Sequence, residues 1–221
     1  VYTRAALGIE APLITVEVHL SNGLPGLTMV GLPETTVKEA RDRVRSALIN
    51  SGYAFPAKKI TINLAPADLP KEGGRYDLPI ALALLVASEQ LNTTRLNQYE
   101  FVGELALTGG LRGVPGAIPS AMEAIKAGRR IVVSSDNAAE VGLIGGSDCL
   151  VADHLQEVCA FLAGQTSLSP PLAEAPARDE RYEDLLDVIG QQQGKRALEI
   201  VAAGGHNLLL IGPPGTGKTM L

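Results

Sequence analysis

The chain has 221 residues, of which 46% are hydrophobic and 4% aromatic, enough for one sizeable core and part of another. Its formal net charge of −5 argues against indiscriminate attraction to nucleic acid, although a local basic face can still bind it. No apolar stretch approaches the roughly 20 residues that span a bilayer, and the N-terminus lacks the layout of a signal peptide, so we expect a cytoplasmic protein without membrane contact.

The first 163 residues predict one α/β domain. Apolar and polar residues alternate as in strands over 14–20 and 58–64, and 27–32 is a further strand candidate. Helical spacing predicts a helix over 34–51, and Asp77 is a candidate N-cap for a very apolar helix over 78–91. The order of these elements indicates layered α/β architecture with a partly parallel sheet. The remaining expected elements are strands over 101–105, 131–134 and 149–152 and helices over 117–127, 138–144 and 155–162.

The composition changes at residue 164. From there to residue 181 the chain is rich in Pro, Ala, Ser and charge, which is typical of a linker. A second unit follows over 182–221, with a helical pattern over 184–203 and a short apolar run over 207–211 that predicts a buried strand.

The second unit ends in a sequence that fits the phosphate-binding pattern G-x-x-x-x-G-K-[ST]. Glycines in such a loop allow backbone conformations and a close approach of phosphate that a Cβ would forbid. Lys218 is expected to act catalytically by bringing its charge to the β- and γ-phosphates, and the Thr219 hydroxyl can bind Mg²⁺. The sequence therefore predicts ATP and Mg²⁺ as cofactors, held by Gly212, Pro213, Pro214, Gly215, Thr216, Gly217, Lys218 and Thr219.

A phosphate loop of this kind needs a strand in front and a helix behind it, and only Met220 and Leu221 follow the motif. We therefore expect a truncated piece of an ATP-using protein that does not hydrolyse ATP by itself and binds nucleotide poorly. Residues 204–221 are expected to be mobile or to adopt a non-native arrangement, because an apolar strand without its sheet lacks partners.

The cysteines and histidines form no metal-binding pattern. Cys149 and Cys159 lack a C-x-x-C spacing and are expected to be buried thiols. The histidines, His19, His154 and His206, are far apart in sequence and are expected to be structural.

The end of the chain resembles the opening of an AAA+ ATPase module. The resemblance is carried by Asp187-Val188-Ile189-Gly190-Gln191, by the helix and apolar run that follow, and by the phosphate loop. In that family the D-V-I-G segment packs around the adenine, which implies nucleotide contacts for Val188, Ile189 and Gly190. The alternative is an ordinary turn that leads into a helix.

Five motifs extend the resemblance over the first domain: Gly23-Leu24-Pro25-Gly26, Val30-Gly31-Leu32-Pro33, Asn63-Leu64-Ala65-Pro66-Ala67-Asp68, Gly73-Gly74-Arg75-Tyr76-Asp77-Leu78-Pro79 and Gly103-Glu104-Leu105. Together they resemble the ComM/YifB family, which is often labelled magnesium-chelatase-like. The resemblance implies a Lon-protease-like domain of the ribosomal-S5 second-domain fold, followed by a truncated P-loop AAA+ fragment. It also implies a homo-hexameric motor that drives branch migration of DNA in natural transformation, with single-stranded or branched DNA as its partner.

Lon-type proteolysis uses a Ser nucleophile and a Lys base, and this chain departs from that pattern. Arg75 stands where the Ser would be, and the position of the Lys falls near Ile118. The sequence leaves open a shifted dyad that pairs Ser88 or Ser120 with Lys126.

The candidate DNA contacts are Lys38, Arg41, Arg45 and Arg75. The first three share one helical face, the fourth lies in a Gly-rich loop, and we expect all four on one exposed surface if the first domain handles DNA. Acidic residues interleave with the helical cations, which favours the alternative of a solvated helix face. Two further functions stay open: a chelatase-type or partner-remodelling ATPase, and a first domain that is a non-catalytic interaction module.

Overall fold

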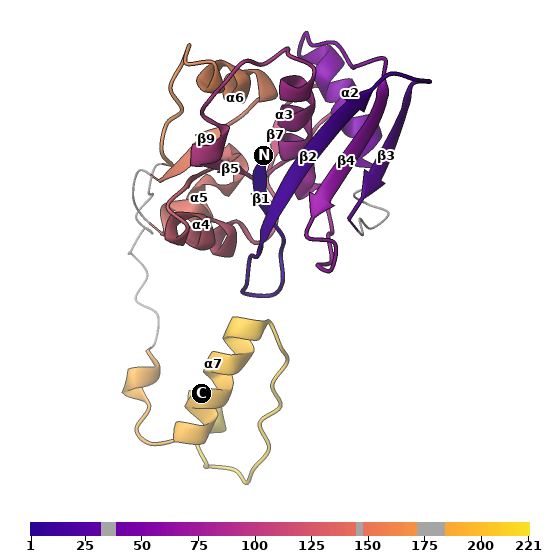
Figure 1. Ribbon diagram of the computed structural model, residues 1–221. Coiled ribbons are helices and arrows are strands. Elements are labelled where there is room, and N and C mark those ends of the chain that lie inside the picture. The colour runs from indigo at the N-terminus through magenta and orange to yellow at the C-terminus, as the bar shows by residue number, and fades with distance from the viewer. Residues whose placement is uncertain (32–38, 145–147, 172–183) are drawn as a thin grey trace. The chain divides into compact units, whose positions relative to one another are not determined.

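A computed structural model gives the structure of the chain and describes residues 1–31, 39–144, 148–171 and 184–221 (Figure 1). The chain divides into two compact units, Val1–Glu174 and Ala175–Leu221, each held mainly by contacts within itself. Within the described ranges, no helix combines the length and apolarity that crossing a membrane requires.

The first unit is built on a seven-stranded mixed sheet with the strand order β3-β4-β2-β1-β5-β8-β9. Strand β2 runs antiparallel to both of its neighbours, β1 and β4, whereas the other neighbouring pairs are parallel. A separate antiparallel pair is formed by β6 and β7. The strands are β1 (Tyr2–Arg4), β2 (Leu13–Ser21), β3 (Gly26–Val30), β4 (Lys59–Ala65), β5 (Tyr99–Phe101), β6 (Glu104–Leu105), β7 (Leu111–Arg112), β8 (Arg130–Ser134) and β9 (Cys149–Ala152).

Helices cover the two halves of this sheet differently. Helices α2 and α3 lie along the part formed by β2, β4 and β3, whereas α4, α5 and α6 pack around β8 and β9 (Figure 1). The helices of the first unit are α2 (Ala40–Asn50), α3 (Asp77–Ala87), α4 (Ala117–Lys126), α5 (Ala138–Gly142) and α6 (Leu155–Leu162), with short 3₁₀ helices η1 (Gly74–Tyr76), η2 (Leu96–Gln98) and η3 (Ser135–Asn137).

The residue patterns of the strands follow from this coverage. In β4 every second side chain, Ile60, Ile62 and Leu64, is buried, as expected for a strand with one covered face. The parallel strand β8 is buried on both faces, because Val132 packs into the larger core whereas Ile131 and Val133 pack into a second cluster with α4 and α5. The parallel half is therefore the more deeply enclosed part of the sheet.

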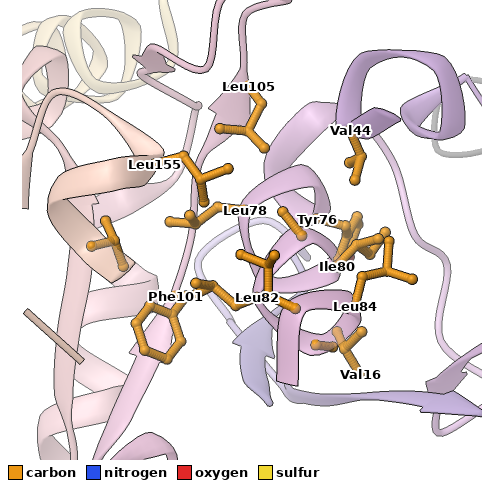
Figure 2. Packing of buried hydrophobic residues seen from close by; sticks show 14 of the residues in the cluster. Val16, Val44, Tyr76, Leu78, Ile80, Leu82, Leu84, Phe101, Leu105 and Leu155 are labelled. Carbon is orange, nitrogen blue, oxygen red and sulfur yellow. The ribbon is translucent and has the colours of Figure 1, made fainter. Parts of the chain in front are cut away.

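Helix α3 is the centre of the larger core. Its residues from Asp77 to Leu85 are all buried, which is the pattern of a helix enclosed on every side. Figure 2 shows its apolar side chains between Val16 of β2, Val44 of α2 and Phe101 of β5. This helix therefore joins the two halves of the sheet into one folding unit.

A buried ion-pair network closes the middle of the sheet. Arg4 on β1 donates from Nε and Nη2 to the two carboxylate oxygens of Glu100 on β5, at 2.6 and 2.7 Å. Arg129, just before β8, donates to the same carboxylate at 2.9 Å. Glu100 is fully buried, so its charge depends on these two partners.

The predicted α/β class and the partly parallel sheet are confirmed, whereas several boundaries differ. The strand expected over 101–105 is split, because Gly103 turns from the sheet to accept a hydrogen bond from Leu78 N and to donate one to Arg75 O. The helix expected over 78–91 ends at Ala87, and strands β1 and β7 were not predicted. Of the helix expected over 34–51, residues 34–38 lie outside the described residues. The assignment to the Lon-like, S5-type fold stays a prediction.

Asp77 is not the N-cap that the sequence predicts. It is the first residue of α3, after the 3₁₀ helix η1, and Tyr76 occupies the cap position. The Asp77 carboxylate instead accepts hydrogen bonds from the Arg43 guanidinium, at 2.7 and 3.1 Å, and from Leu105 N, at 3.2 Å. The side chain therefore ties α3 to α2 and β6 rather than capping its own helix.

The second unit contains α7 (Gln192–Gly204) and the short 3₁₀ helices η4 (Leu185–Asp187) and η5 (Lys218–Met220). The helix expected over 184–203 begins only at Gln192, because Gly190 and Gln191 adopt positive φ values of 78° and 53°. Of the predicted linker over 164–181, residues 172–181 lie outside the described residues, and Ser169 accepts a hydrogen bond from Val151 on β9.

The strand expected over 207–211 does not form. Leu209 and Ile211 are 80% and 86% exposed, and no described strand of the second unit lies beside them. An extended segment becomes a strand only when a neighbour satisfies its backbone groups. The unpaired arrangement is what we expect of an apolar run without a sheet.

Candidate functional site

The phosphate-loop sequence forms an exposed turn that leads into η5. Gly215 and Gly217 have φ values of 80° and 82°, a region that residues with a Cβ rarely adopt. The Thr216 hydroxyl donates to Pro213 O at 2.9 Å and closes the turn. Two of the three glycines of the motif are therefore required by the backbone of this loop.

Lys218 folds back on its own loop. Its ammonium group donates to the carbonyl oxygens of Gly212 and Pro213, at 2.8 and 2.7 Å. These carbonyls are neutral acceptors, so a phosphate oxygen is a stronger partner for the same ammonium group. Lys218 is also the first residue of η5, so its charge stands where a helix begins.

The segment expected around the adenine meets the phosphate loop at two points. The Gln191 amide donates to Thr216 O at 2.7 Å, and Val188 and Thr219 line the same hollow of about 520 Å³. Val188 is 8% exposed, whereas Ile189 is 96% exposed and does not line the hollow. The structure therefore brings Val188 and Thr219 together, and it leaves Ile189 outside. The other lining residues are Asp184, Leu185, Asp187, Met220 and Leu221.

The loop fits a nucleotide phosphate by residue type, whereas the hollow beside it is lined by two carboxylates, Asp184 and Asp187. A Cβ at Gly217 would lie 3.3 Å from the Gln191 amide nitrogen, a tight contact that would shift this side chain by a few tenths of an ångström. Gly190 supplies the positive φ that separates η4 from α7. The sequence interpretation assigned no site contact to Gln191, although its place directly after the D-V-I-G segment is the signal that could have indicated one.

Two of the candidate DNA contacts lie together. Arg41 and Arg45 of α2 line a hollow of about 320 Å³ with Lys58, which the sequence did not indicate. The Arg45 guanidinium lies 5.5 Å from the centroid of the Phe55 ring, and Arg41 Nε donates to Asp42 at 3.1 Å. Lys38 lies outside the described residues.

Arg75 does not join this surface, and the expectation that it would is wrong. It lies in η1, is only 4% exposed, and donates from Nη2 to Pro115 O. It lines a different hollow, with Gly74, Glu104 and Val114 among its neighbours, and burial lowers its pKa. The reason is local: the chain enters the buried helix α3 directly after Tyr76, so η1 is drawn into the core.

The shifted Ser/Lys dyad is not formed. Ser88 Oγ and Ser120 Oγ each donate to a backbone carbonyl one turn earlier, Leu84 O and Gly116 O, at 2.8 Å. Lys126 is largely exposed and pairs with Glu123 at 2.6 Å. The structure thus provides no base for either hydroxyl in the arrangement it describes.

The carboxyl group of Asp77, at the start of α3, has a pKa that is well above its ordinary value. Burial raises its pKa to about 6, and the neighbouring Arg43 guanidinium opposes that rise. The nearby Glu104 carboxylate acts in the same direction as burial. Asp77 therefore titrates closer to neutrality than an exposed aspartate.

Both cysteines are buried free thiols, as predicted, and burial raises the pKa of each. The Cys159 pKa is raised to about 11. In the parts of the chain that the structure describes, no group of three or more His, Cys, Asp or Glu side chains is placed to hold a metal ion.

Comparisons with known proteins match both units. A family model described as "Subunit ChlI of Mg-chelatase" matches residues 16–137, and one described as "Magnesium chelatase, subunit ChlI" matches residues 184–221. YifB of Salmonella typhimurium is 76% identical over 221 residues, and the competence protein ComM of Haemophilus influenzae is 57% identical over 228 residues. The protein Rv2897c of Mycobacterium tuberculosis is 39% identical over 221 residues. Each match covers 100% of this chain and 44% of the relative, so the chain spans less than half the length of these curated relatives.

Proposed function

Because this chain belongs to the ComM/YifB family of magnesium-chelatase-like AAA+ proteins, we propose that it works as part of an ATP-dependent motor that acts on DNA. The observation that carries the proposal is the phosphate loop, which ends in the short 3₁₀ helix η5 and whose Thr219 lines the same hollow as Val188. We propose a cytoplasmic location for this motor.

Each loop residue has a stated task in this proposal. The backbone around Gly215 and Gly217 approaches the phosphates, and Lys218 exchanges its two carbonyl partners for phosphate oxygens. The Thr219 hydroxyl holds Mg²⁺, and Val188 contacts the adenine, with Ile189 and Gly190 as its neighbours in the same segment. When bound, Mg-ATP supplies the phosphoanhydride bond whose hydrolysis drives the motor.

DNA and further copies of the chain are the proposed partners. The name of the Haemophilus influenzae relative, competence protein ComM, supports a role in natural transformation. We propose a homo-hexameric ring that moves branch points along DNA, and single-stranded or branched DNA as the substrate.

The test is ATP hydrolysis by the complete protein, with and without forked DNA. We expect DNA to stimulate hydrolysis, Lys218→Ala to abolish it, and the control Lys126→Ala to leave it unchanged, because Lys126 is exposed and its ion pair is with the partly exposed Glu123. Hydrolysis that survives Lys218→Ala would contradict the role of the loop, and a lack of any DNA stimulation or branch migration would contradict the DNA-acting motor.

The 221-residue chain alone is expected to be inactive. Its phosphate loop is exposed and lacks a neighbouring sheet in the described residues, so Lys218 and Thr219 are not held rigidly. Titration calorimetry should therefore detect only weak ATP binding by this chain, and a malachite-green assay should detect no turnover. Micromolar affinity would contradict this expectation.

A chelatase-type or partner-remodelling ATPase is the second candidate, because both matching family models are described as ChlI of Mg-chelatase. In that case the first unit is a non-catalytic interaction module. ATP hydrolysis that is stimulated by a protein partner and not by DNA would favour this function.

A further inference from the structure

Three elements meet at one edge of the sheet to form the hollow lined by Arg41, Arg45 and Lys58. Arg41 and Arg45 are four residues apart on α2, so their side chains lie on the same side of the helix. Lys58 ends the loop that enters β4, and Gly26 and Leu27 of β3 complete the wall. Two of the cations are therefore carried by helix α2 and the third by the residue directly before β4, so the core elements hold their backbone positions.

The charge of this hollow distinguishes it from the others. Its lining contains no carboxylate, whereas the hollows beside Arg75, beside β9 and in the second unit each contain two. Among the described residues, neither Arg45 nor Lys58 forms an ion pair, and the pair between Arg41 and Asp42 is largely exposed. An exposed pair of this kind contributes little and is readily exchanged. Three cations thus face one hollow of a chain whose net charge is −5.

Phe55 orients one of these cations. The Arg45 guanidinium lies over its ring, 5.5 Å from the centroid, which is within the range of a cation–π contact. A guanidinium already held in place loses less conformational freedom when it binds a ligand. Phe55 is therefore a positioning residue for Arg45.

We propose that this hollow, lined by Arg41, Arg45 and Lys58, binds the phosphodiester backbone of a DNA strand. The proposal rests on the DNA-acting function above, adds Lys58 to the contacts, and excludes Arg75. Guanidinium groups offer phosphate oxygens paired N–H donors, and the Lys58 ammonium adds a compact charge. Leu27, Phe55 and Pro56 supply apolar surface between the cations for the sugar.

A DNA strand fits this hollow better than an acidic peptide does. A DNA strand carries a phosphate at every nucleotide whatever its sequence, so several phosphates can reach the three cations that line one hollow, whereas a peptide offers carboxylates only where acidic residues stand. The contacts reach only the backbone, so the binding is independent of base sequence.

The test uses the 221-residue chain with Arg41→Gln, Arg45→Gln and Lys58→Gln combined, which keeps much of each side chain's length and removes three charges. The matched control combines Arg112→Gln, Lys126→Gln and Arg196→Gln, which removes the same charge from exposed ion pairs elsewhere. Fluorescence anisotropy then measures binding of a labelled 30-nucleotide single strand and of a forked duplex across a salt series.

We expect the variant that combines Arg41→Gln, Arg45→Gln and Lys58→Gln, here called the pocket variant, to bind DNA about tenfold more weakly than the control. The salt slope for the single strand should fall by about two, because each lost phosphate contact removes roughly 0.7 from the slope. Equal binding by the two variants, or no binding by the parent chain at low salt, overturns the proposal. A labelled polyglutamate peptide that binds the parent chain more tightly than DNA, and loses its binding in the pocket variant, also overturns it in favour of a protein partner.

The same variants in the complete protein separate this inference from the proposed function. If forked DNA stimulates ATP hydrolysis equally in the pocket variant and the control, the motor stands and the hollow is not its DNA contact. If DNA stimulates neither the parent nor the variants, the proposed function itself fails.

Discussion

The two units of this chain differ in where the recognisable motif lies and where the side chains are buried. In the first unit α3 is buried on every side, although its residues carry no recognisable chemical motif. In the second unit α7 has no buried residue, although the loop that follows it carries the most specific motif of the chain. A motif thus identifies chemistry from residue type alone, whereas the rigidity that chemistry needs comes from packing. The following substitutions test that contrast.

The largest difference is expected between two glutamates in ion pairs. Glu100→Ala should lower the free energy of unfolding of the first unit by about 3 to 5 kcal/mol, because Arg4 and Arg129 lose their shared carboxylate inside the protein. Glu199→Ala removes the exposed partner of Arg196 and should cost less than about 1 kcal/mol. Urea denaturation followed by circular dichroism measures both, and equal effects would contradict the contrast.

Apolar side chains should show the same contrast at a smaller scale. Leu82→Ala leaves a cavity in the core and should cost about 3 kcal/mol. Leu209→Ala, at a position that is mostly exposed, should cost less than about 0.5 kcal/mol. A cost above about 1 kcal/mol at Leu209 in the same denaturation assay would mean that the second unit has a core of its own.

Asp77 gives the first unit a predicted pH dependence. The folded chain holds the proton of this carboxyl up to about pH 6, whereas the unfolded chain releases it near 3.8. The folded state therefore binds more protons in this window, and the contribution of Asp77 to the free energy of unfolding falls as pH rises from about 4 to 6. Asp77→Asn should remove that fall, while Asp42→Asn, at an exposed position, should retain it. Thermal melts at intervals across this window measure the effect, and identical profiles for both variants would contradict it.

The smallest effect is expected in the second unit. Gln191→Ala removes the amide that donates to Thr216 O, an exposed hydrogen bond worth about 1 kcal/mol. Amide hydrogen exchange of Met220, whose N–H donates to Gly217 O, should become faster by a few fold, and Gln193→Ala in the first turn of α7 should leave it unchanged. Unchanged exchange in the Gln191 variant would show that the loop does not depend on this contact.

Helices and strands could be predicted from the sequence where burial by neighbouring elements leaves a clear apolar pattern. Alternation in β4 and continuous apolarity in α3 both follow from coverage by neighbouring elements. The prediction came within one residue of both ends of β4 and of the start of α3, but it placed the end of α3 four residues too late. The short strands β1 and β7 were missed, because each is too short to show a period.

The candidate site residues divide into those that the local sequence determines and those that tertiary packing places. The glycines of the phosphate loop could be predicted, because the positive φ values of Gly215 and Gly217 are a local property. The placement of Arg75 could not, because its burial depends on how η1 enters the core, and its Gly-rich surroundings indicate an exposed loop. Lys58 was missed for the related reason that β4 and α2 meet only in three dimensions.

The two edges of the sheet differ, and the difference affects how the protein behaves at high concentration. On the outer edge of β9, Val151 N already donates to Ser169 O of the same chain. On the outer edge of β3, no residue of the described ranges pairs with the strand, and its five residues carry no charge. Unpaired, uncharged edges are where separate chains add to one another and aggregate. Within the first unit, loss of solubility should therefore begin at β3, and Thr28→Lys, at an exposed position of this strand, should reduce it.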